Sequence, residues 1–210
     1  MNLAAEPKID CHMHVLDPAR FPYNPAVAYK PAGQEIGTPA QFDAVMAHDG
    51  VTHALIVQPN SGYGSDNSLM LDTIARGKGR FKGIAIIDFN ASLAELRDLQ
   101  AQGVVGAAFN PTFHGSDYYR DAKPLIGRLA ELGMFVQLQT EHDQLLPFVK
   151  WVEDMPVPTL IDHCGRPTVA QGLNQPAFQA LLKLADTGPY FTESKISMMS
   201  PGCLRITRPQ

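Results

Sequence analysis

Short runs of apolar residues recur along the chain, and each is followed by a segment with helical signals. The first run spans Lys8 to Val15, and later runs begin near residues 52, 81, 104, 134, 159 and 190. Most of these runs are apolar almost throughout, which is typical of strands buried on both faces of a parallel sheet. The pattern therefore predicts an α/β fold with a TIM (β/α)8-type barrel, built here from about seven strand–helix units.

Helix start and stop signals lie between the apolar runs. Thr38 is placed to cap a helix that Gly50 ends, and Ser92 with Glu95 forms the pattern of a capping box. The proline-rich segment from Leu16 to Gly37 is expected to be a long loop that covers or closes a site. Further helices are expected up to Arg76, from about Ala122 to Leu132, from Gln144 to about Glu153 and from Gln175 to Ala185.

The end of the chain leaves little room for a complete barrel. A seventh strand is expected from Tyr190 to Ser197, after which thirteen residues remain. An eighth strand with its flanking helices would need roughly 40 residues. We therefore expect a single domain over residues 1–210 that lacks strand 8. Either the sequence is a truncated or frameshifted part of a longer protein, or a second chain supplies the missing part.

Composition narrows the classes of function. The 210 residues are 45% hydrophobic and carry a net charge of −4, with a pI near 5.9. No run of lysines or arginines is present to bind nucleic acid, and no stretch of about 18 apolar residues is present to span a membrane. The three cysteines and the lack of a signal-peptide pattern suit a reducing, cytoplasmic setting. A small-molecule substrate is the partner that this composition leaves, and a homo-oligomer is compatible with it.

Histidines gather at the expected carboxyl ends of the strands. Side chains alternate along a strand, so His12 and His14 are expected to point to the same side of the first strand. His114, His142 and His163 follow the fourth, fifth and sixth strands. Because active sites of parallel barrels lie at the carboxyl ends of the strands, five of the seven histidines are expected on one rim. The alternative is that His12 and His14 are merely packed or solvated at a strand end.

A second polar cluster follows the sixth strand, in the segment Asp162 to Pro167. A histidine that leaves a barrel strand, here His163, can polarise a carbonyl group. Arg166 can hold a carboxylate or an oxyanion through its two-pronged donor face. The alternative is an ion pair between Asp162 and Arg166 that only fixes the loop.

Several motifs, in order along the chain, resemble the amidohydrolase superfamily, and within it the branch of the 2-pyrone-4,6-dicarboxylate lactonases. The similarity runs from about Lys8 to Pro201, nearly the whole chain. The motifs are Asp10 to Val15, Arg20 to Tyr23, Val57 to Pro59, Gly64 to Asn67, Phe109-Asn110, Asp162 to Pro167 and Lys195 to Ser197.

The resemblance implies a TIM-barrel hydrolase that opens small ring lactones, which are carboxylic esters. Histidines matching His12, His14 and His163 surround the scissile carbonyl in this family, and the arginine matching Arg166 binds a substrate carboxylate or oxyanion. An aspartate on strand eight activates water there, and no counterpart of its motif is found in this sequence. The remaining residues expected to bind substrate are Asn67, Gln139 and His114.

Departures from the family pattern bear on the substrate. Where the lactonase carries arginines on and after the fourth strand, this sequence has Ala108 and His114. Gln139 stands where a tyrosine is expected at the end of the fifth strand. Loss of a bidentate guanidinium contact removes roughly 1.5 to 3 kcal/mol, which argues against a dicarboxylate substrate. We therefore expect the lactonase-like branch without that particular substrate.

No metal is firmly expected. His12, His14 and His163 would be the ligands of a divalent ion such as zinc, but Gln139 stands where metal-dependent relatives place a histidine. The sequence therefore predicts a hydrolase without a cofactor and leaves zinc as the alternative. Two other functions stay open. One is a metal-dependent decarboxylase of the same superfamily, and the other is an inactive fragment or ligand-binding remnant.

Overall fold

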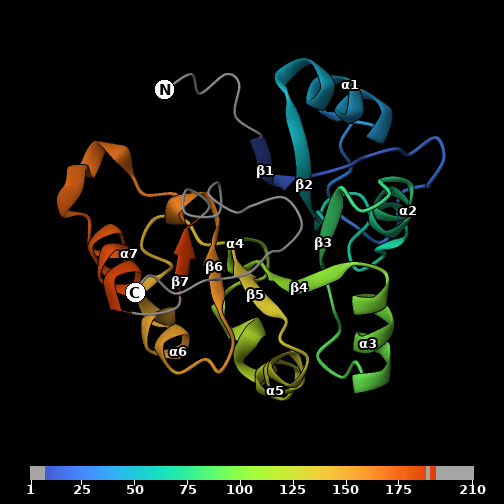
Figure 1. The fold of residues 1–210 in the computed structure, drawn as a ribbon. Helices are drawn as coiled ribbons and strands as arrows, with labels where there is room; N and C mark the ends of the chain where they lie inside the picture. The colour runs from blue at the N-terminus through green and yellow to red at the C-terminus, as the bar shows by residue number, and fades with distance from the viewer. Residues whose placement is uncertain (1–7, 188–189, 193–210) are drawn as a thin grey trace. The chain divides into compact units, whose positions relative to one another are not determined.

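The structure, a computed structural model, describes residues 8–187 and 190–192 and contains two compact units (Figure 1). The first unit holds residues 8–87 and 97–105. The second holds residues 88–96 and the described residues from 106 onward. Each unit repeats the order of strand and helix. The single domain expected over residues 1–210 stays a prediction.

Three parallel strands form the sheet of the first unit. In order they are β1 (Lys8–Met13), β2 (Val51–Val57) and β3 (Phe81–Ala85). The pairing of β2 with β3 is regular, whereas the pairing of β1 with β2 shifts register between Asp10 and Met13. Ile56 and Ile84 are completely buried. The buried, parallel strands confirm the predicted α/β class in this unit.

Local capping explains where the helices of this part of the chain begin and end. The helices are α1 (Pro39–Asp49), α2 (Ser68–Arg76) and α3 (Leu93–Ala101). The Thr38 hydroxyl accepts from the backbone N–H of Gln41 at 3.3 Å, and Gly50 ends α1 with φ of 70°. Before α3, the backbone N–H of Ser92 donates to the Glu95 carboxylate at 2.7 Å. Both predicted caps are therefore confirmed.

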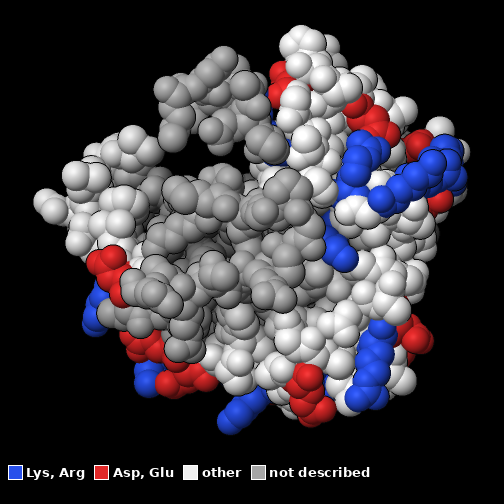
Figure 2. Space-filling view, viewed as in Figure 1, with Lys and Arg blue, Asp and Glu red and all other residues white. Residues whose placement is uncertain are grey.

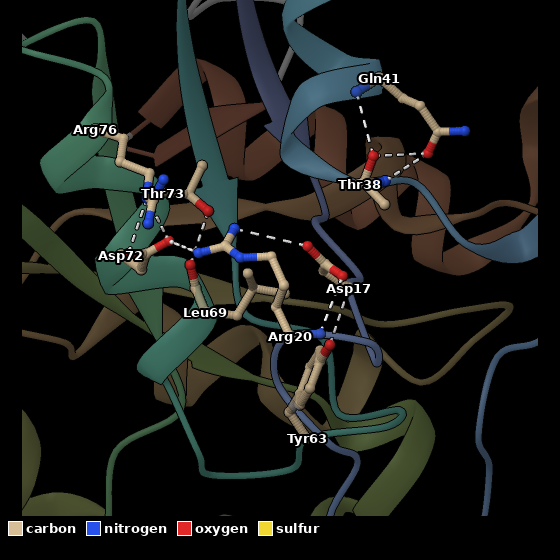
Figure 3. Close-up of polar contacts among 9 residues, drawn as sticks. All are labelled: Asp17, Arg20, Thr38, Gln41, Tyr63, Leu69, Asp72, Thr73 and Arg76. Carbon is tan, nitrogen blue, oxygen red and sulfur yellow. Dashed lines mark hydrogen bonds and ion pairs between the residues drawn. The ribbon is translucent and has the colours of Figure 1, made fainter.

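The segment between β1 and α1 is a long loop, as predicted, with one short 3-10 turn, η2 (Gly33–Glu35). Its start is clamped to α2 by Arg20, which lies 3.1 Å from Asp72 (Figure 3). Arg76 contacts the same carboxylate at 2.8 Å. Desolvation alone would raise the pKa of Asp72, but the hydrogen bonds and charges of Arg76 and Arg20 lower it overall.

Figure 2 shows Lys and Arg side chains beside Asp and Glu over the region of α1 and α2.

Parallel strands also form the sheet of the second unit. In order they are β4 (Val104–Phe109), β5 (Phe135–Leu138), β6 (Thr159–Ile161) and β7 (Tyr190–Thr192). A Cβ atom at Gly106 would lie 2.6 Å from the carbonyl oxygen of Phe135, so β4 and β5 approach closely because glycine has no side chain. The expected seventh strand is present from Tyr190, and its predicted end at Ser197 lies outside the described residues.

The helices of the second unit are more numerous than predicted, and several of them are short. They are α4 (Pro111–His114), η3 (Ser116–Asp121), α5 (Lys123–Glu131), η4 (Leu146–Phe148), α6 (Val149–Glu153), η5 (Asp162–Gly165), η6 (Val169–Asn174) and α7 (Pro176–Thr187). The expected helix from Gln144 to Glu153 becomes a 3-10 turn and then α6, because Pro147 lacks the N–H that an earlier start would need. Among the described helices, none combines the length and apolar character of a membrane span.

Candidate active site

His12 and His14 form a close pair at the end of β1. Their Nε2 atoms are 3.3 Å apart, and the ring centroids are separated by 4.9 Å. The Nδ1 atom of His14 lies 2.7 Å from the carbonyl oxygen of Val57. A carbonyl oxygen only accepts hydrogen bonds, so the proton of a neutral His14 ring sits on Nδ1 and its Nε2 carries a lone pair. The contact confirms that the two imidazoles point to the same side of the strand.

Asn67, in the loop after β2, is bound to backbone. Its Nδ2 donates to the carbonyl of Ile86 at 2.9 Å and to that of Ser65 at 3.1 Å. Its Oδ1 accepts from the Ile86 N–H at 3.1 Å. These bonds tie the loop after β2 to the segment that follows β3. The Asn67 side chain therefore positions the loop after β2. The substrate contact that the sequence suggested for Asn67 stays a prediction.

In the second unit, polar side chains link the ends of β4 and β5. The Nδ2 of Asn110 donates to Gln139 Oε1 at 3.2 Å. Just beyond, the hydroxyl of Thr112 lies 3.1 Å from Gln144 Oε1. The backbone N–H of Asn110 donates to the Tyr119 hydroxyl at 2.6 Å. Gln139 is thus held in place next to the end of β4, which is where the sequence predicts part of the substrate site.

His114 follows β4, as expected, and is the last residue of α4, a short helix that the sequence pattern did not predict. The helix forms because Asn110 caps it and Pro111 sits at its first position. The His114 ring stacks on Tyr118 with a centroid distance of 4.4 Å and an interplanar angle of 16°. Desolvation lowers the pKa of His114 from its ordinary value. The ring is therefore neutral at pH 7.

The turn after β6 carries both His163 and Arg166. Asp162 opens the turn, is only 2% exposed and accepts a hydrogen bond from Gln137 of β5. Residues 163–166 all have positive φ, between 44° and 72°. This conformation costs on the order of 1 kcal/mol or more for each residue with a Cβ atom. A strained turn of this kind persists only where the surrounding structure holds it.

The loop after β5 supplies part of that support. The backbone N–H of His142 donates to the carbonyl of Arg166 at 3.1 Å, and its ring Nδ1 lies 2.8 Å from the Thr168 hydroxyl. Next to it, Asp143 accepts from the N–H of Ala177 at 3.2 Å, at the start of α7. Sequence reasoning missed Asp143, because a cap supplied from a distant segment leaves no local pattern.

The predicted site residues fall into local groups within the two units. These groups are His12 with His14, His163 with Arg166, and Gln139 with His114 through Asn110. The amide of Asn67 binds the backbone of Ile86. Every group follows the carboxyl end of a strand, which is where active sites of parallel barrels lie.

Comparison with known proteins gives these groups a context. A 4-sulfomuconolactone hydrolase of Hydrogenophaga intermedia is 31% identical over 180 residues, which is 83% of this chain and 58% of that protein. A 2-pyrone-4,6-dicarboxylate hydrolase of Comamonas testosteroni is 31% identical over 178 residues, 83% of this chain and 57% of that protein. The chain therefore spans a little under three fifths of the length of these curated relatives.

A solved structure shows the same fold. It is a probable 2-pyrone-4,6-dicarboxylic acid hydrolase from Acinetobacter baumannii with citric acid bound, 26% identical, with a TM-score of 0.76. The likeness covers 89% of this chain and 69% of that one, and it confirms the predicted TIM-barrel-type fold in incomplete form. The model of the family described as amidohydrolase (Amidohydro_2) matches residues 9–201. On this match and these identities, the chain belongs to the amidohydrolase family.

Proposed function

We propose that this chain acts as a hydrolase that opens a small cyclic ester. The observation that carries the proposal is 31% identity, over 83% of the chain, to proteins named as hydrolases of a muconolactone and of a pyrone. In the reaction, the oxygen of water bonds to the carbonyl carbon and the ring C–O bond breaks. The ring oxygen takes up a proton and leaves as a hydroxyl group, and the carbonyl becomes a carboxylate.

We assign carbonyl activation to His12, His14 and His163. An imidazole N–H directed at the carbonyl oxygen stabilises the negative charge that develops there during attack by water. The bond from His14 to Val57 fixes the tautomer and the orientation of its ring before substrate binds, and it leaves a neutral His14 with a lone pair at Nε2. The N–H that faces the carbonyl oxygen therefore comes from His12 or His163, and His14 acts through its Nε2 lone pair. His163 leaves β6 in a turn whose backbone is strained but held, which is common at functional sites.

Substrate binding falls to a second set of side chains. Arg166 supplies a guanidinium group that can bind a carboxylate through two parallel hydrogen bonds. Gln139 presents an amide that Asn110 already orients. Asn67 and His114 complete the proposed set, Asn67 mainly by fixing the loop after β2.

The His12–His14 pair also fits two positions of a divalent metal site. The Nε2 atoms are 3.3 Å apart, close to the roughly 3.4 Å expected for two nitrogens bound tetrahedrally to one zinc ion. A ligating histidine usually donates its other ring N–H to a carbonyl or carboxylate, as His14 does to Val57. His163 is the candidate third ligand, and a bound ion would act as a Lewis acid toward the carbonyl. Hydrolysis without a metal stays our prediction, with zinc as the alternative.

The test is ring opening by the purified 210-residue chain. It is measured as the loss of lactone absorbance for each member of a panel of lactones. Replacing His12 or His163 by alanine should lower kcat/KM at least about 100-fold. His48 lies in the last turn of α1, before the amino end of β2, and its side chain is exposed, so H48A is the matched control and should keep wild-type activity. Absence of turnover for every lactone, or equal activity of H12A and H48A, would contradict the proposal. Elemental analysis of protein purified without added metal decides the cofactor, since a stoichiometric divalent ion would overturn the metal-free prediction.

A further inference from the structure

Aromatic rings gather on the surface directly after β4. Phe113 is 50% exposed and Tyr118 is 52% exposed, which is a large exposed area for two rings of one short segment. His114 lies between them, stacked on Tyr118 and meeting Phe113 edge-on at a centroid distance of 4.8 Å. We call Phe113, His114 and Tyr118 the ring platform.

The ring platform rests on a rigid base. Tyr119 is buried beneath it and stacks on Phe109 of β4 with a centroid distance of 4.7 Å and an interplanar angle of 27°. The Tyr119 hydroxyl accepts from the backbone N–H of Asn110 at 2.6 Å. Asn110 in turn caps α4, the helix that carries Phe113 and His114. The exposed rings are therefore held in a fixed arrangement, which lowers the entropy cost of binding a ligand on them.

The ring platform carries no positive charge of its own. Residues 104–119 contain neither lysine nor arginine, and their one acidic residue is Asp117. Arg120, the next basic residue along the chain, pairs with Asp117 at 2.6 Å. His114 is neutral at pH 7 because desolvation lowers its pKa. A carboxylate placed here would gain little electrostatic stabilisation, whereas a flat uncharged group would stack on the rings.

The ring platform lies next to a residue that we assign to substrate binding. It follows the carboxyl end of β4, and Asn110 links its helix to Gln139 at the end of β5. We propose that the ring platform is a subsite for an uncharged, flat part of the lactone, so that the substrate carries at most one carboxylate. This inference rests on the proposed function and specifies its substrate class.

Turnover of two lactones that differ at one position tests whether the chain prefers a flat uncharged group to a second carboxylate. The pair is 4-phenyl-2-pyrone-6-carboxylate and 2-pyrone-4,6-dicarboxylate, in which phenyl replaces one carboxylate. The wild type should prefer the phenyl compound in kcat/KM, and Y118A should reduce that preference about threefold to tenfold by removing a stacking partner. H114R adds a cation and should move the preference toward the dicarboxylate. L182A, which removes an exposed apolar side chain of α7, should leave the preference unchanged. An equal or higher kcat/KM of the wild type for the dicarboxylate would overturn the inference.

A binding measurement separates failure of this inference from failure of the proposed function. The probes are 3-phenylbenzoate and isophthalate, neither of which can be hydrolysed, and the readout is the NMR signals of the His114 ring. Saturable shifts with 3-phenylbenzoate that weaken in Y118A support the subsite even if no lactone turns over. Tighter binding of isophthalate, or shifts that persist unchanged in Y118A, would reject the subsite even if lactones are hydrolysed.

Discussion

His14 donates its Nδ1 hydrogen to the carbonyl oxygen of Val57 across 2.7 Å, and this bond joins the end of β1 to the end of β2. It has two effects on the proposed site. It sets the ring plane of His14, and it leaves Nε2 as the nitrogen that faces His12. Structure and chemistry therefore depend on different atoms of the same ring, so substitutions can separate them.

Replacement of His14 by asparagine and by alanine should make that separation visible. Asparagine can place its Nδ2 near the former Nδ1 and keep the bond to Val57. The free energy of unfolding of H14N should therefore lie within about 0.5 kcal/mol of the wild-type value. Alanine leaves the carbonyl without this partner and should cost about 1 kcal/mol. Both variants lack Nε2 and should lose at least about 100-fold in kcat/KM. Urea unfolding and lactone kinetics measure the two effects, and an active H14N would show that Nε2 is not needed.

The cap that Asp143 places on α7 should be worth a measurable amount of stability. Its Oδ1 accepts from the Ala177 N–H at 3.2 Å and lies 3.5 Å from Nε2 of Gln175. Loss of a helix cap typically costs 0.5 to 2 kcal/mol, so D143A should lower the free energy of unfolding by about 1 kcal/mol and D143N by less.

D154A is the matched control for the cap. Asp154 pairs with Lys150 one turn away on α6, and both side chains are exposed. Removing such a pair should cost no more than about 0.5 kcal/mol. Equal midpoints of urea unfolding for D143A and D154A would show that the bond to α7 contributes nothing.

His114 should make stability depend on pH. Desolvation lowers its pKa in the folded chain below the ordinary value of 6.5, so the unfolded chain binds the proton more tightly. The contribution of the neutral ring to the free energy of unfolding is complete above pH 6.5 and is lost as the pH falls toward the folded-state pKa. H114Q, which does not titrate, should flatten this fall in a series of urea unfolding curves. An NMR titration of the His114 ring with a midpoint at or above 6.5 would contradict the prediction.

The fold could be predicted largely from local patterns. Thr38, followed by a proline and ended by Gly50, specifies α1 through contacts within a few residues. Apolar runs of strand length specify the strands, because a strand buried on both faces is apolar almost throughout. The helix α4 was missed since its four residues are too few to show a helical period. Similarly, nothing local predicts positive φ at Cys164 or Arg166, because glycine is the residue that favours this conformation.

The candidate site could be predicted only in part, for a related reason. Alternation along a strand is a local rule, and it was sufficient to pair His12 with His14. Contacts with distant backbone follow no such rule. The bonds from His14 to Val57 and from Asn67 to Ile86 span 43 and 19 residues, and they depend on how the strands are brought together. Sequence reasoning therefore finds the chemical groups, and the structure shows what orients them.

Two glycines of the second unit provide a test of its packing, because the structure predicts opposite effects for the same substitution. A Cβ atom at Gly106 would lie 2.6 Å from the backbone oxygen of Phe135, and a paired strand cannot move away at little cost. At Gly127, in the middle of α5, a Cβ atom would meet nothing within 4 Å. G106A should therefore lower the free energy of unfolding by about 1 to 3 kcal/mol. G127A should raise it by about 0.5 to 1 kcal/mol, because alanine favours the helix. Urea unfolding measures both, and a neutral G106A would mean that β4 and β5 lie farther apart than the structure places them.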